Sequence, residues 1–230
     1  MTIEDIRDKI DDIDKDIARL LKQRWQQVNR ISQLKKLIPQ QAGYRPFRER
    51  DIYEKLPEDD EVKRDEYWTI WKEIMTTTVM RENAFQVAVA ENFFHQYGFW
   101  LAQEFGRRTK WLTDNIKTDD EALCHISERR AGLAVVSLQA VDSFLAWQNN
   151  IAIVNIFPSF MFANDNKISP DNILGLIVAW QTMEQVDGDA ALAVVLDKEK
   201  KKFDIVMPNK AKQQNIIAMV PRPYDWQDEK

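Results

Sequence analysis

The chain has 230 residues and a mass of 27.1 kDa, a size that fits one large domain or two small ones. Apolar residues make up 44% and charged residues 30%, which supplies enough apolar material for a core and excludes a disordered chain. The 32 basic and 37 acidic residues give a net charge of −5, so a global positive field for nucleic acid is excluded and any bound anion needs a local pocket.

Cysteine and histidine are too few for a disulfide framework or a zinc cluster. Cys124 is the single cysteine, and His95 and His125 are the two histidines. The N-terminal segment is charged from its fourth residue, and no apolar run of about 18 residues follows. We therefore expect no metal site, no signal peptide and no membrane partner, and a cytoplasmic location.

The first predicted element is a helix over residues 3–38, bounded by a capping box at Thr2 and Asp5 and by Pro39. Apolar residues recur along it in steps of three and four: Ile3, Ile6, Ile10, Ile13, Ile17, Leu20, Leu21, Val28, Ile31 and Ile38. A stripe over about 50 Å long is too long to bury against one short neighbour. We expect a partner helix from a second chain, with a monomeric helical hairpin as the alternative.

Two further helices are predicted in the first 85 residues. Pro46 sets the start of a short helix over 47–56, and a longer helix follows over about 63–83. The apolar face of this longer helix consists of Trp68, Trp71 and Met75. The N-terminal region is therefore predicted to be all helical.

After residue 84, short β-rich runs alternate first with helices and then with turns. The predicted strands are 85–90, 132–138, 151–157, 175–183, 190–196, 203–207 and 216–220. The predicted helices are 96–105 and 119–129. The sequence thus predicts a multidomain chain, with a helical domain over 1–85 and an α/β domain over 86–230 that becomes more antiparallel toward its end.

Basic residues interrupt the apolar stripe of the first helix at Arg24 and Lys35. They are eleven residues apart, which places them on one face about 16 Å apart, and both side chains can converge on a compact dianion. Interhelical salt bridges are the alternative. Arg7 lies beside the same stripe but about 25 Å from Arg24, so in an antiparallel dimer it would serve the pocket of the other chain.

Polar groups also extend the apolar face of the third helix, at Thr78 and Glu82. A core threonine bonded to its own backbone is the alternative for Thr78, and an ion pair with an arginine is the alternative for Glu82. Arg48 and Glu49 on the short helix are also candidate site residues. The alternative for them is that they lie on a solvated face of that helix.

Together these residues carry a resemblance to a known family. The segments IRDKIDDIDKDIARLLKQRWQQVNRISQLKKL and YRPFRERDIYEKL resemble the all-helical class of chorismate mutases of aromatic amino acid biosynthesis. The resemblance covers about residues 3–85 and implies a three-helix domain in an intertwined homodimer. It also implies that chorismate is rearranged to prephenate without a cofactor or a covalent intermediate.

The resemblance implies a binding role for several of these residues. Arg7 of the neighbouring chain and Arg24 would hold the substrate carboxylates, assisted by Arg48 and Thr78. Such residues position the substrate so that its enolpyruvyl side chain lies over the ring.

The resemblance implies that Lys35 and Glu82 face the ether oxygen and that Glu49 accepts the ring hydroxyl. Bacterial members more often have Gln at the position of Glu82. A carboxylate cannot donate a hydrogen bond, so Glu82 must be protonated, and we expect activity to be favoured at mildly acidic pH.

A second resemblance concerns residues 86–230. The segments QVAVA, YGFWLAQEFG and DDEALCHISERRAGLAVVSL are similar to one lobe of prephenate dehydratase. The Thr-Arg-Phe motif of that family and its glycine-rich start are absent from the sequence. We therefore expect a degenerate dehydratase-like domain with a structural or regulatory role.

Three functions remain open from the sequence. The first is a homodimeric chorismate mutase with an appended α/β domain. The second is an isochorismate-pyruvate lyase, which uses the same helical fold and has a loop lysine. The third is a non-catalytic dimerisation or effector-binding module with a vestigial pocket.

Overall fold

The computed structural model describes residues 2–35, 44–57, 64–82, 86–159, 172–180, 191–197, 200–207, 211 and 216–221. The chain divides into two compact units, residues 1–41 and residues 42–230. Each unit is described by itself below.

The first unit contains one long helix, α1 (Ile3–Lys35). The predicted capping box is confirmed, because the Thr2 amide donates to Asp5 Oδ2 at 2.6 Å and the Asp5 amide donates to Thr2 Oγ1 at 3.1 Å. These bonds satisfy amide groups that a helix leaves unpaired at its start. The predicted end of the helix at Pro39 lies outside the described residues.

The second unit begins with the helices α2 (Pro46–Glu54) and α3 (Arg64–Glu82). Pro46 occupies the first turn of α2, where its missing amide hydrogen has no cost. The rings of Tyr53 and Trp68 pack edge to face, with centroids 5.1 Å apart. The apolar cluster between the two helices consists of Tyr53, Leu56, Trp68 and Met75. The three predicted helices are therefore confirmed.

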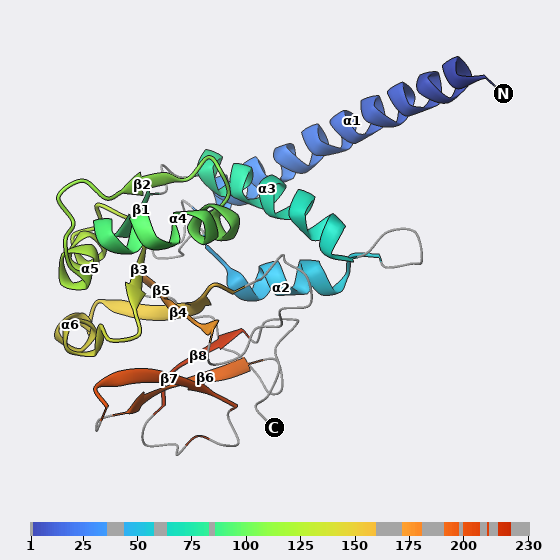
Figure 1. Cartoon of the computed structure of the whole chain (residues 1–230). Helices are drawn as coiled ribbons and strands as arrows, with labels where there is room; N and C mark the ends of the chain where they lie inside the picture. The colour runs from blue at the N-terminus through green and yellow to red at the C-terminus, as the bar shows by residue number, and fades with distance from the viewer. Residues whose placement is uncertain are drawn as a thin grey trace. The chain divides into compact units, whose positions relative to one another are not determined.

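A mixed five-stranded sheet forms the centre of the second unit (Figure 1). Its strands are β1 (Gln86–Val89), β2 (Lys110–Leu112), β3 (Leu133–Ser137), β4 (Ile151–Phe157) and β5 (Gly175–Trp180). The spatial order is β2-β1-β3-β5-β4. Strands β1, β2 and β3 are parallel, and β5 is antiparallel to both β3 and β4.

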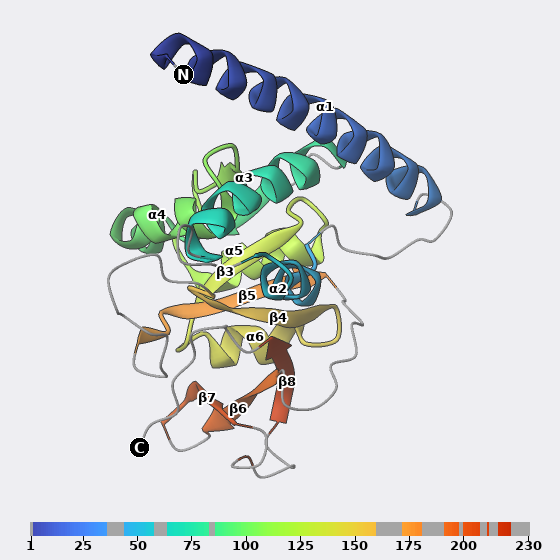
Figure 2. The ribbon, with the colours of Figure 1, turned by 90° about the vertical axis from the view of Figure 1, so that its right-hand side faces the viewer.

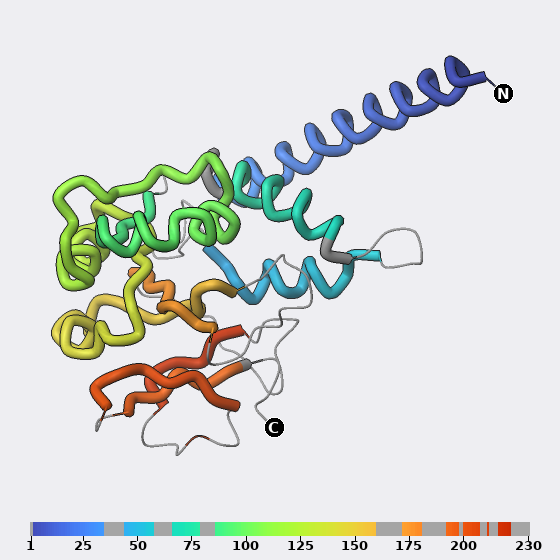
Figure 3. Tube along the Cα trace, in the orientation of Figure 1, coloured from blue at the N-terminus to red at the C-terminus, as the bar shows by residue number. Residues whose placement is uncertain are grey.

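Helices connect the parallel strands, and the tube in Figure 3 follows these crossovers. They are α4 (Glu91–Phe105) between β1 and β2 and α5 (Asp119–Ser127) between β2 and β3. A third helix, α6 (Val141–Trp147), lies between β3 and β4. Parallel strands need such crossovers, and the predicted alternation of strands with helices after residue 84 is confirmed.

A second, antiparallel sheet has the order β7-β6-β8 and lies next to the first sheet (Figure 2). Its strands are β6 (Ala191–Asp197), β7 (Lys202–Val206) and β8 (Ile216–Pro221). One apolar core runs through both sheets, with Phe144 of α6 packed edge to face on Phe203 of β7. The predicted antiparallel character of the C-terminal part is confirmed.

The sequence prediction omitted two elements and misplaced the start of a third. Strand β2 and helix α6 have only 3 and 7 residues, which is too short for a clear periodic pattern. Helix α4 begins at Glu91, five residues before the predicted start, and its N-cap residue Ala90 makes no side-chain capping bond. An N-cap without a capping side chain leaves no start signal in the sequence.

Candidate active site

Helix α1 has an exposed apolar face in the single chain. Large side chains of the predicted stripe are between 45% and 71% exposed: Ile3, Ile6, Ile10, Ile13, Ile17, Leu20 and Ile31. Leu34 is also 63% exposed. A continuous apolar patch of this kind marks an interaction surface rather than a solvated face.

The basic residues predicted for the site on α1 differ in exposure. Arg7 is exposed, and Arg24 is half-buried at a more central position of the helix. Lys35 is the last residue of α1, and its side chain lies outside the described part. The helix therefore carries these three positions on one continuous backbone, as their spacing predicts.

Helix α2 presents Arg48 and Glu49 in its first turn, in different environments. The Arg48 guanidinium is exposed and lies 3.9 Å from the carboxylate of Asp51. The Glu49 side chain is only 17% exposed, and its Oε2 lies 2.7 Å from the ammonium of Lys72. The solvated face that was the alternative for this pair therefore describes Arg48 but not Glu49.

Thr78 is buried on α3, and its hydroxyl donates to the Ile74 carbonyl at 2.8 Å. This is the backbone bond of the core-threonine alternative, and it uses the hydroxyl proton of Thr78. Glu82 is the last residue of α3, and its side chain lies outside the described part.

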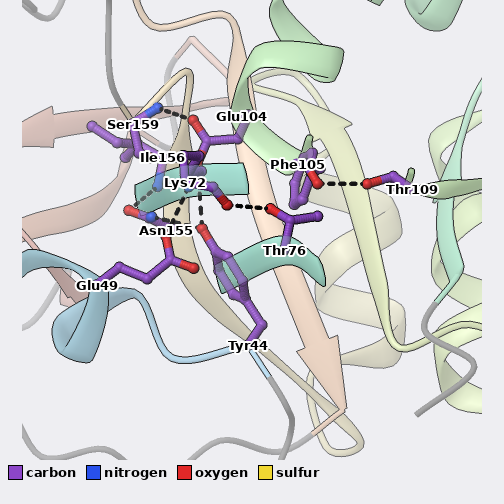
Figure 4. Close-up of polar contacts among 10 residues, drawn as sticks. All are labelled: Tyr44, Glu49, Lys72, Thr76, Glu104, Phe105, Thr109, Asn155, Ile156 and Ser159. Atoms are coloured by element: carbon purple, nitrogen blue, oxygen red, sulfur yellow. Dashed lines mark hydrogen bonds and ion pairs between the residues drawn. The ribbon is translucent and has the colours of Figure 1, made fainter. Parts of the chain in front are cut away.

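A buried polar cluster joins α2 and α3 to the α/β region (Figure 4). At its centre, Lys72 Nζ donates to Glu49 Oε2 at 2.7 Å and to Glu104 Oε1 at 3.3 Å. Lys72 is 4% exposed and Glu104 is 3% exposed. We call this the Lys72 cluster; it consists of Tyr44, Glu49, Lys72, Glu104, Asn155 and Ser159.

Glu104 has further donors besides Lys72. Ser159 donates its amide to Oε2 at 2.9 Å and its hydroxyl to Oε1 at 2.5 Å. The Tyr44 hydroxyl lies at the edge of hydrogen-bond distance from the same carboxylate, at 3.5 Å, and accepts a bond from the side-chain nitrogen Nδ2 of Asn155 at 3.0 Å. Buried charges require such partners, so Glu104 is a well-satisfied carboxylate.

The electrostatics of the cluster keep Lys72 charged. Burial lowers the pKa of Lys72, but Glu104 and then Glu49 raise it, and the result is a pKa above the ordinary value. Burial is also the main cause that raises the pKa of Tyr44, with Glu104 and Glu49 acting in the same direction. Lys72 therefore acts as a fixed cation at neutral pH and not as an amine nucleophile, and Tyr44 remains a neutral phenol.

The pKa of Glu49 is raised by burial and, in smaller part, by Glu104, while Lys72 lowers it. Lys72 thus favours the ionised form of Glu49 in a place where burial opposes it.

Lys72 and Glu104 are not among the site residues predicted from the sequence. The signal was present, because Lys72 continues the apolar face of Trp68 and Met75 in steps of four and three. Glu104 likewise lies beside two buried residues of α4, Leu101 and Phe105. A charge within an apolar face predicts a buried partner, but which partner it meets depends on the tertiary fold.

The three helices match one family model. Residues 6–83 match chorismate mutase type II. This match supports chorismate mutase activity in general for the helical region, and it contains all the predicted site residues. Neither the curated proteins nor the solved structures gave a match.

The match to chorismate mutase type II ends at residue 83, so the similarity of residues 86–230 to a dehydratase lobe stays a prediction. Within the described residues, no helix is long and apolar enough to cross a membrane. The same residues contain no group of three or more histidine, cysteine or carboxylate side chains that could hold a metal ion.

Proposed function

We propose that this protein is a homodimeric chorismate mutase that rearranges chorismate to prephenate in a pocket shared by two chains. The observation that carries the proposal is the joint spacing of its charged residues within the matched region 6–83. These are Arg7, Arg24, Lys35, Arg48 and Glu49.

The reaction is an intramolecular rearrangement, so the protein contributes positioning and charge. Arg24 and Arg48 bind the substrate carboxylates, and Thr78 assists when its hydroxyl turns from the Ile74 carbonyl to donate to a carboxylate. Lys35 and a protonated Glu82 donate to the ether oxygen, where negative charge develops. A millionfold acceleration needs about 8 kcal/mol, which preorganised cations in a dry pocket supply.

Arg7 acts in the pocket of the neighbouring chain. On one straight helix it is about 25 Å from Arg24, too far for both to hold one small substrate. The exposed apolar face of α1 supports an antiparallel helix pair, which brings Arg7 of one chain to Arg24 and Lys35 of the other.

The α/β region is proposed to be a degenerate dehydratase-like domain that is structural or regulatory. Its β–α–β–α–β opening supports the similarity, and the missing Thr-Arg-Phe motif argues against dehydratase activity.

The proposal is tested by the loss of chorismate absorbance together with the appearance of prephenate. We expect the wild type to be active and Arg24→Ala to lose about a hundredfold or more in kcat/KM, the cost of one preorganised donor to charge. Arg19→Ala is the matched control, because Arg19 is an exposed arginine of the same helix that pairs with Asp16.

Product analysis with isochorismate tests the lyase alternative, because that enzyme releases pyruvate. A wild type that is inactive on both substrates while still dimeric would favour the non-catalytic module. Equal activity of Arg24→Ala and Arg19→Ala would contradict the assigned role of Arg24.

A further inference from the structure

We propose that Lys72 and Glu104 are positioning residues for the mutase reaction, through which the α/β region holds Glu49 in place for the substrate. The inference rests on the proposed function, in which Glu49 accepts the ring hydroxyl. It adds that the mutase site is incomplete without a side chain from helix α4.

The two carboxylate oxygens of Glu49 have different environments. Oε2 accepts from Lys72 Nζ at 2.7 Å, whereas Oε1 has no hydrogen-bond partner among the described residues. One oxygen is held and the other can accept a hydroxyl. Figure 4 shows the Lys72 side chain between Glu49 and Glu104.

Lys72 is itself held from the α/β region. Its second carboxylate partner, Glu104, belongs to α4 and is fixed by the amide and hydroxyl of Ser159, just after the end of β4. A lysine side chain has many rotamers, and the bonds to two carboxylates, at 2.7 Å to Glu49 and 3.3 Å to Glu104, favour one of them. The chain of contacts therefore runs from β4 through Glu104 and Lys72 to Glu49.

Two titratable groups from other segments shift the pKa of Glu49, and they act in opposite directions. Lys72 of α3 lowers the pKa of Glu49, and Glu104 of α4 raises it. Tyr44, which precedes α2, stays neutral because its pKa is raised. The charged residues close to Glu49 in the sequence, in its own helix and N-cap, are Arg45, Arg48, Arg50 and Asp51.

These opposite effects allow a sharp test, because Glu49 must be ionised to accept the hydroxyl strongly. The acid side of the pH profile of kcat/KM then reports its ionisation. In Lys72→Met the acid side moves to higher pH, because burial and Glu104 now act without opposition. In Glu104→Gln it moves to lower pH, because the negative charge that opposed ionisation is gone.

The rates provide a second readout. We expect kcat at neutral pH to fall about tenfold in Lys72→Met, because the acceptor is no longer oriented. Lys72→Arg keeps the positive charge and should leave the acid side of the pH profile of kcat/KM near its wild-type position. Glu104→Gln keeps the shape of the side chain and remains informative if Lys72→Met does not fold, which circular dichroism shows.

Matched controls carry the same charge changes at exposed positions, Lys110→Met on β2 and Glu73→Gln on α3. If the wild type is active but the acid side of the pH profile does not move in Lys72→Met and Glu104→Gln, this inference is overturned and the proposed function stands. The same holds if the controls move the acid side equally. A wild type without mutase activity overturns the proposed function and the inference with it.

Discussion

Helix α1 and the Lys72 cluster depart from the usual distribution of residues in opposite ways. Helix α1 leaves isoleucine side chains about half exposed or more along its length. The Lys72 cluster encloses a cation and two carboxylates whose side chains are between 1% and 17% exposed. Apolar groups thus lie outside in one region, and charges lie inside in the other.

The two regions differ in the source of the groups that compensate for these unusual placements. In the Lys72 cluster every charge finds its partner within the same chain, from α2, α3, α4 and the residues after β4. The apolar face of α1 is exposed among the described residues, so we propose that a second chain covers it. The comparison predicts that substitutions in α1 weaken association, whereas substitutions in the cluster weaken the fold.

The largest effect is expected for Ile10→Asp combined with Ile17→Asp. Burial of one isoleucine contributes about 1.5–3 kcal/mol. A dimer contains four of these positions, so its Kd should rise more than about ten-thousandfold while each chain keeps its secondary structure. Sedimentation equilibrium and circular dichroism measure the two quantities. Asp12→Ala with Lys15→Ala, an exposed ion pair of the same helix, is the control; equal dimer affinity in both variants would contradict the interface.

A smaller effect, on the fold itself, is expected for Lys72→Met. Removal of one partner from a buried ion pair costs about 3–5 kcal/mol, because the remaining charges stay buried. The free energy of unfolding from urea titration should fall by this amount. The double variant Lys72→Met, Glu104→Gln should be less destabilised than Lys72→Met, and additive losses would show that the two side chains are not coupled.

The smallest effect is expected at a helix cap that repeats the motif of α1. At the start of α5, Thr118 accepts from the Glu121 amide and Glu121 accepts from the amides of Lys117 and Thr118. Thr118→Ala should lower the free energy of unfolding by about 1 kcal/mol. Thr2→Ala should change it less, because Thr2 caps an exposed first turn that can fray.

The carboxylate of Glu121 in the same cap should make the stability of the fold depend on pH in a known direction. The pKa of Glu121 is lowered, first by its bond from the Lys117 amide. Its contribution to stability is therefore present above the ordinary pKa of 4.5 and is lost as the pH falls through the lower folded value. Glu121→Gln should reduce this acid sensitivity, measured by thermal unfolding between pH 6 and about pH 3. An unchanged pH dependence would show that the carboxylate does not bind these amides in solution.

Much of the secondary structure could be predicted from the sequence because its signals are local. The capping box at Thr2, the proline at the start of α2 and the short apolar runs of β1, β3 and β4 each lie within a few residues. Strand β2 and helix α6 were missed because they are too short to show a period. The positions of Arg7, Arg24 and Lys35 on α1 also follow from helical geometry alone.

The sequence by itself determined most of the helices and strands and the spacing of the basic residues. The tertiary structure alone decided that Lys72 lies between Glu49 and Glu104, which are 23 and 32 positions away in the chain, and that Ser159 holds Glu104 across 55 positions. Periodicity fixes which face of an element a residue occupies. The partner that it meets there depends on which distant elements pack together, because a buried charge is stable only where the whole fold supplies its opposite.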